Sequence, residues 1–242
     1  MRYEFEIIDV ADSTNSLLKK RAKSEVEGKA LIANRQTAGK GRLGRSFYSP
    51  GGCGLYMSIL LKPHITPKDS LLITTCAAVS VCEAIEMLSG KSAGIKWVND
   101  VFIGGKKVCG ILTESAISGG RLEYAVLGIG VNLYDCGFPD DIKDIAGAVF
   151  DGEPNGLEMR DKMAKAICER FFDYYERLIE KRFLDEYRRR CIAVGKQIMV
   201  LKNGTERYAT ALEITDSFAL SVEYEDKTRE KLSSGEVSIR LK

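Results

Sequence analysis

Histidine, tryptophan and long apolar runs are scarce in this 242-residue sequence, and each scarcity excludes a class of protein. The single histidine, His64, cannot build a metal site based on several histidines, and its surroundings indicate a surface loop. No unbroken apolar run of about 18 residues occurs, which argues against a membrane span. Charged Arg2, Glu4 and Glu6 follow Met1 closely, so we expect no export signal and a cytoplasmic protein.

An excess of one charge and paired cysteine motifs are also lacking. The 36 basic and 34 acidic side chains leave a formal charge of +2, so the surface as a whole would attract neither nucleic acid nor a membrane. Seven cysteines form an odd set without a Cys-x-x-Cys pair, and several lie in apolar runs. We therefore expect reduced, buried side chains. They are Cys53, Cys76, Cys82, Cys109, Cys136, Cys168 and Cys191.

Hydrophobic periodicity predicts a large α+β part. Possible N-cap side chains at residues 12–15 precede a short helix, and Thr66 with Pro67 marks the start of a long one. A second long helix is expected from Asn155 to Leu178. Strand signals separated by glycine-rich turns predict a mixed or antiparallel sheet flanked by these helices. The expected strands are residues 30–33, 55–61, 94–97, 108–113 and 122–133.

From Gly195 onward the sequence consists of short strand signals separated by turn residues. This texture predicts a small β-barrel of about fifty residues. So short a chain rarely stabilises itself, and we expect the barrel to pack on the larger part. Residues 1–190 are therefore predicted to form the catalytic domain, and residues 191–242 the barrel. The expected barrel strands are residues 196–201, 207–213, 218–224 and 236–241.

Residues 39–45, Gly-Lys-Gly-Arg-Leu-Gly-Arg, combine three cations with three glycines between two strands. Glycines permit close backbone approach and cations attract anions, so this segment could wrap a phosphate or a carboxylate. By itself, such a loop is equally typical of RNA contact or of no binding at all. It is not a P-loop, and residues 128–133 do not complete the dinucleotide fingerprint, because Leu133 replaces the last glycine.

Two segments farther along carry polar residues at predicted strand ends. Residues 96–100, Lys-Trp-Val-Asn-Asp, place a lysine, an aromatic ring and a carboxylate within five positions. Asp100 could hold a metal or orient a ligand, although a turn is the plainer interpretation of Asn99 and Asp100. Residues 107–112 begin a strand with a lysine, and Gly110 would let a flat ligand lie against the backbone.

Together these segments resemble the successive motifs of the biotin protein ligase family. The resemblance rests on residues 13–15, 36–45, 96–100, 107–112 and 128–132, in that order. Residues 235–240 are similar to the closing motif of the family, so the resemblance extends over nearly the whole chain. The sequence departs from the family pattern at Lys40, Phe47 and Val98, where arginine, tryptophan and proline are common.

The resemblance implies a fold like that of class II aminoacyl-tRNA synthetases and biotin ligases, with an SH3-like C-terminal barrel. It also implies an enzyme that activates biotin with ATP and Mg²⁺ to biotinyl-AMP and transfers biotin to one lysine of a biotin carboxyl carrier protein. The family core begins here by about residue 8, so no operator-binding domain is expected, and no membrane partner is expected either. The oligomeric state stays open, with a homodimer among the options.

The same resemblance implies the roles of individual residues. Lys107 and Arg42 would be the catalytic cations, Lys107 beside the biotin carboxylate and Arg42, with Arg45, in a loop that closes over the adenylate. Asp100 would assist ATP and magnesium. Biotin would be bound by Ser13, Thr14, Asn15, Gln36, Gly39, Lys40, Arg42, Lys107 and Gly110. The nucleotide would be bound by Arg42, Arg45, Phe47, Lys96, Asn99, Asn132 and Arg240.

Two other functions stay open from the sequence. A lipoate or octanoate protein ligase would share the general fold and the acyl-lysine product, but residues 39–45 and 96–100 favour biotin. A nucleic-acid-binding module could use the basic loop and the small barrel. The near-zero net charge and the single tryptophan, Trp97, argue against that module.

Overall fold

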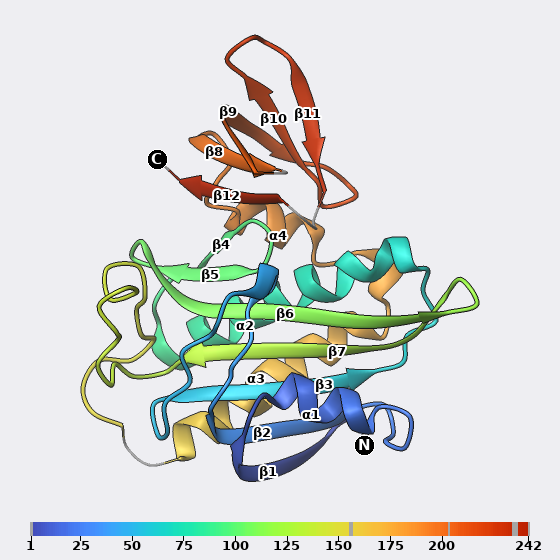
Figure 1. The fold of residues 1–242 in the computed structure, drawn as a ribbon, viewed down its shortest axis with the longest axis vertical. Helices are drawn as coiled ribbons and strands as arrows, with labels where there is room; N and C mark the ends of the chain where they lie inside the picture. The colour runs from blue at the N-terminus through green and yellow to red at the C-terminus, as the bar shows by residue number, and fades with distance from the viewer. Residues whose placement is uncertain (1, 155–156, 203, 234–236, 242) are drawn as a thin grey trace.

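A seven-stranded sheet forms the larger part of the molecule (Figure 1). The computed structural model describes residues 2–154, 157–202, 204–233 and, for the backbone alone, 237–241. The strand order is β1-β2-β3-β7-β6-β5-β4, with β1 and β2 parallel and all other neighbours antiparallel, so the predicted mixed sheet is confirmed. The strands are β1 (Glu4–Ala11), β2 (Lys29–Gln36), β3 (Gly54–Leu61), β4 (Gly94–Lys96), β5 (Asp100–Ile103), β6 (Lys106–Ser118) and β7 (Arg121–Asn132).

Helices cover both faces of this sheet. In Figure 1, α1 (Thr14–Arg21) lies on the near face, and α2 (Leu71–Ser89) and α3 (Glu158–Tyr175) lie behind the sheet. β3 is buried at all eight positions because it lies at the centre, between β2 and β7, and under helices on both sides. The described residues also form three short 3-10 helices, η1 (Arg42–Gly44), η2 (Pro67–Ser70) and η3 (Leu178–Glu180).

The central helix α2 is almost wholly apolar. Together with η2 it is long and apolar enough to cross a membrane by composition, yet 72% of its most apolar stretch is buried inside the fold. Its side chains pack against β4, β5, β6 and α3, and Gly90, in the left-handed conformation at φ 69°, ends it. The helix is therefore accounted for as the core helix of this domain.

A second, five-stranded sheet follows the helix α4 (Leu184–Arg190) and stands above the first in Figure 1. Its order is β11-β10-β9-β8-β12, antiparallel throughout. The predicted closed barrel is not found among the described strands, because β11 and β12 form the two edges and do not pair with each other. The strands are β8 (Gln197–Lys202), β9 (Thr205–Ile214), β10 (Leu220–Tyr224), β11 (Arg229–Leu232) and β12 (Val237–Leu241).

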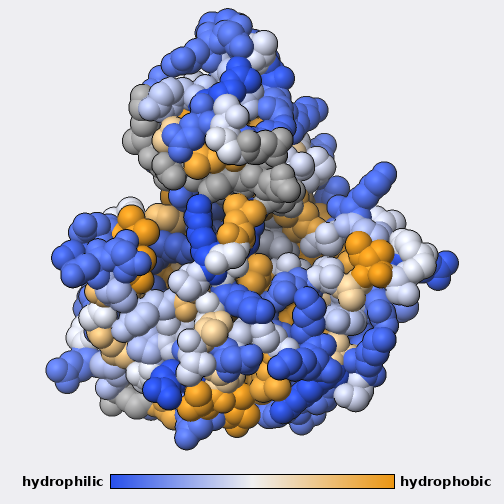
Figure 2. All heavy atoms as spheres, viewed as in Figure 1, coloured by the Kyte–Doolittle hydropathy of each residue, from blue (hydrophilic) through white to orange (hydrophobic). Residues whose placement is uncertain are grey.

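Three strands have no counterpart in the sequence-based prediction: β1, β5 and β11. Charged residues occupy three of the eight positions of β1 and three of the four positions of β11, and both are edge strands of their sheets. On the face seen in Figure 2, hydrophobic patches are scattered among hydrophilic residues, and one gathers at the lower edge, where Figure 1 places β1. Residues 97–99 form the turn predicted around Asn99, and Asp100 follows it as the first residue of β5, paired with Lys96. Asn155, the expected start of the second long helix, lies outside the described residues.

Two of the seven cysteines are bonded, contrary to the expectation that all are reduced. Cys53 and Cys136 form a disulfide with their Cα atoms 6.0 Å apart. Cys53 immediately precedes β3 and Cys136 follows β7, and the pairing of Gly54 with Asn132 brings these two strand ends together. Sequence spacing could not reveal the pair because 83 residues separate its members. The other five cysteines are free and buried, as predicted.

Candidate functional site

The floor of a cavity on the α1 side of the large sheet is made of backbone rather than side chains. Tyr56 of β3 pairs with Gly130 of β7, and Gly130 pairs with Gly110 of β6. Gly128 lies two residues earlier on β7, on the same face. Because side chains alternate between the faces of a strand, three glycines leave a hollow on one face while residues such as Ile129 fill the core. The cavity and the open solvent at its mouth together contain about 950 Å³ that protein atoms do not occupy.

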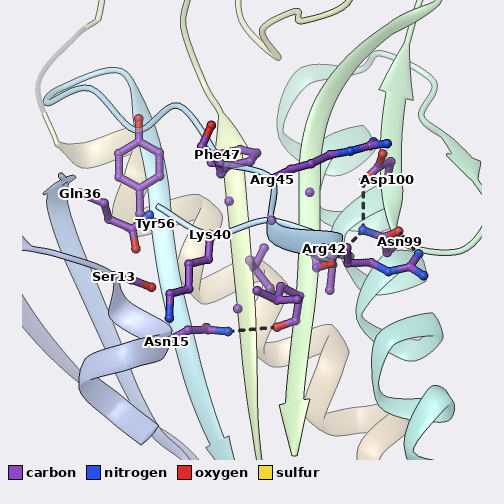
Figure 3. Close-up of a pocket in the computed structure, with 18 of the residues that line it drawn as sticks. Ser13, Asn15, Gln36, Lys40, Arg42, Arg45, Phe47, Tyr56, Asn99 and Asp100 are labelled. Atoms are coloured by element: carbon purple, nitrogen blue, oxygen red, sulfur yellow. Dashed lines mark hydrogen bonds between the residues drawn. The ribbon is translucent and has the colours of Figure 1, made fainter. Parts of the chain in front are cut away.

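Polar side chains at the start of α1 close one end of the cavity (Figure 3). Ser13 caps the helix, and its Oγ accepts a hydrogen bond from the N–H of Ser16 at 3.4 Å. The backbone N–H and the hydroxyl of Thr14 both donate to Gln36 Oε1, at 2.8 and 3.1 Å. Gln36 Nε2 donates to Ser49 at 3.0 Å. This network fixes the amide of Gln36 at the wall of the cavity.

Asn15 lies against the floor at the same end. Its Oδ1 accepts from the buried hydroxyl of Ser58 at 2.6 Å, and its Nδ2 donates to Glu114 at 3.1 Å. A side chain at Gly128 would collide with the Asn15 amide, so the glycine is required there. Burial alone would raise the pKa of Glu114, but donors from Asn15 and Lys19 outweigh it and hold that pKa below its ordinary value. An ionised carboxylate thus stands behind Asn15.

The glycine-rich loop folds over the middle of the cavity. Lys40 and Ser46 form an isolated β-bridge, and the N–H of Phe47 donates to the carbonyl of Gly39 at 2.9 Å, so the loop closes on itself. In Figure 3 the side chain of Lys40 extends toward Asn15, the polar end of the cavity. The loop brings Lys40, Arg42 and Arg45 into the lining of the cavity.

Arg42, Asn99, Asp100 and Lys107 form a connected group at the other end. Arg42 donates to Asn99 Oδ1 at 2.8 Å, and Asn99 Nδ2 donates to Asp100 Oδ1 at 3.0 Å (Figure 3). The same carboxylate oxygen lies 2.7 Å from Lys107 Nζ. Burial lowers the pKa of the Arg42 guanidinium, although the nearby Asp100 counteracts the shift. Two cations from distant segments are thus joined through one amide and one carboxylate.

Positive charge dominates the lining of the cavity. Five cations face it, whereas the described lining residues include one carboxylate, that of Asp100. A concave site with this imbalance attracts anions, and charged hydrogen bonds to phosphates or carboxylates are strong. The five cations are Lys40, Arg42, Arg45, Lys96 and Lys107.

The ring of Phe47 covers the glycine floor. A Cβ atom at Gly130 would lie 2.5 Å from this ring, and one at Gly110 would lie 3.2 Å from it. The ring also meets Tyr56 edge-on, with centroids 6.5 Å apart. A flat ligand on this part of the floor would therefore contact Phe47, which can offer an aromatic face to it.

Most of the predicted site residues lie around this one cavity. Gly39 and Asn132 do not line it: Gly39 packs closely against Phe47 and Ser49, and Asn132 donates to the carbonyl of Gly147 at 3.0 Å. The side chain of Arg240, like most of the motif at residues 235–240, lies outside the described residues. The predicted residues that line the cavity are Ser13, Thr14, Asn15, Gln36, Lys40, Arg42, Arg45, Phe47, Lys96, Asn99, Asp100, Lys107 and Gly110.

Sequence reasoning gave no role to several residues that line the cavity, among them Tyr56, Trp97, Gly128 and Gly130, although the last three lie in motifs that it singled out. The alternating glycines at 128 and 130 were a usable signal, because alternate positions in a strand share one face. Tyr56 gave no signal, since it lies in a continuous apolar run whose two faces look alike in sequence.

The lining residues do not form a resident metal site. No group of three or more histidine, cysteine, aspartate or glutamate side chains suited to a metal occurs in the described ranges. Asp100 offers one carboxylate to the cavity. One carboxylate together with phosphate oxygens and waters is a common donor set for Mg²⁺. The site therefore fits a Mg²⁺ ion that arrives with a polyphosphate.

Residues 7–132 match the Biotin/lipoate A/B protein ligase family. The chain is 40% identical over 141 residues to the bifunctional ligase/repressor BirA of Bacillus spizizenii, covering 57% of this chain and 43% of that protein. It is 34% identical over 165 residues to the biotin–[acetyl-CoA-carboxylase] ligase of Paracoccus denitrificans, covering 67% and 65%. The chain thus spans less than half the length of the repressor that it matches.

The fold is similar to that of a biotin protein ligase from Aquifex aeolicus, solved in complex with biotin and ATP. The TM-score is 0.83 at 28% sequence identity, and the superposition covers 99% of both chains. The match therefore includes the smaller sheet as well as the larger one.

Proposed function

The chain belongs to the Biotin/lipoate A/B protein ligase family, and from that premise we propose that it is a biotin protein ligase. One observation carries the proposal: a single cavity joins a floor without side chains to a rim of five cations. Biotin combines a compact ring system with a carboxylate on an aliphatic chain, and ATP brings phosphates. The floor suits the ring system, and the cations suit the anionic groups.

The first step of the proposed reaction activates biotin. Its carboxylate attacks the α-phosphorus of ATP, the mixed anhydride biotinyl-AMP forms, and pyrophosphate leaves. Negative charge grows on the oxygens around the phosphorus, and Lys107 and Arg42 are placed to stabilise it. The carboxylate attacks in its ionised form, so positioning and charge matter more than proton transfer. Mg²⁺ bound to the phosphates would neutralise further charge, and Asp100 is the residue proposed to assist it.

The second step transfers biotin to protein. A lysine amine of the acceptor attacks the acyl carbon of biotinyl-AMP, loses a proton, and AMP leaves as the amide forms. The loop at residues 39–47 would keep water from the anhydride meanwhile. The name of the Paracoccus relative, which specifies acetyl-CoA carboxylase, supports a biotin carboxyl carrier protein as the acceptor.

The proposed subsites follow the two ends of the cavity. Biotin would bind at the polar end, formed by Ser13, Thr14, Asn15, Gln36 and Lys40, with Gly110 in the floor. The nucleotide would bind at the cationic end, near Arg45, Phe47, Lys96 and Asn99. Residues 1–190 would form the catalytic domain, and residues 191–242 an SH3-like domain that brings Arg240 toward the nucleotide.

A lipoate ligase is the closest rival, and one experiment separates the two. The purified chain with Mg²⁺ and radiolabelled pyrophosphate should show ATP–pyrophosphate exchange that depends on biotin and needs no carrier protein. Lipoate and octanoate serve as matched controls, because each carries a carboxylate without biotin's ureido ring. Exchange with lipoate and none with biotin would refute the proposal in favour of the rival.

A further inference from the structure

The segment between β4 and β5 is held from outside the large sheet. Trp97 is 4% exposed, and its indole N–H donates to the carbonyl of Phe218 at 2.9 Å. The carbonyl of the next residue, Val98, accepts from the hydroxyl of Tyr187 at 3.1 Å. Both bonds are buried, where a missing partner is costly. Tyr187 belongs to α4, and Phe218 belongs to the turn before β10. Two elements of the C-terminal part therefore hold this short segment by hydrogen bonds.

The partners of the segment are themselves rigidly placed. The Phe218 ring is fully buried between Phe183, which it stacks on at 5.3 Å, and Tyr187, which it meets edge-on at 5.3 Å. Phe218 has φ 61°, and its N–H donates to the carbonyl of Thr215 at 2.9 Å, which fixes the turn. Arg188 on α4 donates to the carbonyl of Ile214 at 3.0 Å. The turn and α4 thus form one packed unit.

The segment held by these two hydrogen bonds, Trp97 and Val98, is followed directly by residues at the charged end of the cavity. Asn99 follows Val98, bonds to Arg42 and Asp100, and accepts from the N–H of Ile111 at 3.0 Å through its own carbonyl. A shift of the backbone at Val98 would therefore move the amide that joins the two cations. Tyr187 and Phe218 do not line the cavity themselves.

We propose that Tyr187 and the Phe218 turn are positioning residues, which set Asn99 and Asp100 for use of the nucleotide. The inference rests on the proposed function and deepens it: the C-terminal part would serve adenylation through these two hydrogen bonds, independently of Arg240. A displacement of about 1 Å at a reacting centre can slow a reaction by about 10²-fold. Loss of one hydroxyl that acts through the backbone should thus be visible in kinetics.

The decisive variant is Tyr187→Phe, which removes one oxygen and keeps the packed ring. We expect kcat/KM for ATP in adenylate formation to fall by about tenfold or more, with the affinity for biotin within about twofold of wild type. Trp97→Phe removes the other bond and should act in the same direction, although Trp97 also lines the cavity. Tyr175→Phe is the matched control, because it removes a tyrosine hydroxyl bonded to Glu27, away from the cavity.

A second measurement is independent of activity. Amide hydrogen exchange at Ile111 reports on Asn99, because the Ile111 N–H is bonded to the Asn99 carbonyl. We expect faster exchange at Ile111 in Tyr187→Phe than in Tyr175→Phe. Lowered melting temperature with unchanged ATP kinetics and unchanged Ile111 exchange would overturn the proposal, since Tyr187 would then serve stability alone. If the wild type adenylates no acid while exchange at Ile111 still rises, the positional coupling stands and the proposed function fails.

Discussion

Removal of the positive charge should have different kinetic consequences at Lys107 and at Arg42: the first should slow formation of the adenylate, and the second should shorten its retention. Lys107 is held on β6 by two backbone hydrogen bonds. Its backbone N–H donates to the carbonyl of Ile145 at 2.7 Å, and its carbonyl accepts from the N–H of Gly147 at 2.9 Å. A charge on so rigid an element is preorganised for the transition state. Lys107→Met, which keeps the aliphatic stem, should therefore slow adenylate formation itself.

The size of the effect follows from the exposure of Lys107. Two unit charges about 4 Å apart at an effective dielectric constant near 20 interact by about 4 kcal/mol, which sets an upper limit. The Lys107 side chain is 32% exposed and shares Asp100 as a counter-ion, so solvent and the carboxylate reduce its effect. We expect the single-turnover rate of adenylate formation to fall by about 10²-fold, which is the lower end of the range for removal of one charge-stabilising donor.

Arg42→Met should mainly affect retention of the adenylate. Arg42 belongs to the loop that closes on itself over the cavity, and its bond to Asn99 ties that loop to β5. Without this tie, biotinyl-AMP should leave faster and hydrolyse or label exposed amines. The assay measures adenylate formation by rapid quench and adenylate release by trapping, with Lys106→Met as the control lysine on the same strand. Slow formation with wild-type retention in Arg42→Met would refute the assignment of Arg42 to the lid.

Three further predictions concern stability and the cavity floor. Cys136→Ser should lower the free energy of unfolding by about 2–4 kcal/mol in urea without reductant, and equal midpoints for variant and wild type would contradict it. Glu86 has its pKa lowered chiefly by Arg190, so its stabilising effect is complete above the ordinary value of 4.5 and is lost as pH falls through the lower folded value. Glu86→Gln should therefore flatten the loss of stability from about pH 5 to about pH 3, and an unchanged slope would exclude this pair as the cause. Gly130→Ala should weaken ATP binding in calorimetry, since its Cβ atom displaces Phe47 of the proposed nucleotide subsite, with wild-type affinity as the refuting result.

Most residues that sequence reasoning singled out line one cavity, because they lie in short contiguous motifs. The loop around Arg42 and the strand start at Lys107 are recognisable from their own residue types, and the sheet then brings them together. The turn predicted at Asn99 and Asp100 is present at residues 97–99, and its end was misplaced by one residue because pairing with Lys96 makes Asp100 the first residue of a strand.

The features that escaped sequence reasoning depend on register and long-range contact. Cys53 and Cys136 meet only because β3 and β7 are neighbours, a relation that no spacing rule contains. The bond from Tyr187 to Val98 joins residues 89 positions apart, so it too depends on packing. The edge strand β1 was missed because its charged residues interrupt its apolar residues without the strict alternation that marks a strand with one buried face.

The glycine floor has a consequence for redesign of this molecule. At Gly110, Gly128 and Gly130 a side chain would point into the cavity, whereas their strand neighbours Ile111 and Ile129 point into the core. The shape of the cavity can therefore be changed at Gly110 and Gly130 without repacking the core, whereas Gly128 must stay a glycine because of the Asn15 amide. A one-residue shift in the register of β7 would exchange its two faces. The isoleucine side chain would then enter the cavity, and a glycine would leave a void in the core. The strand register that keeps the protein folded is the same register that keeps its cavity open.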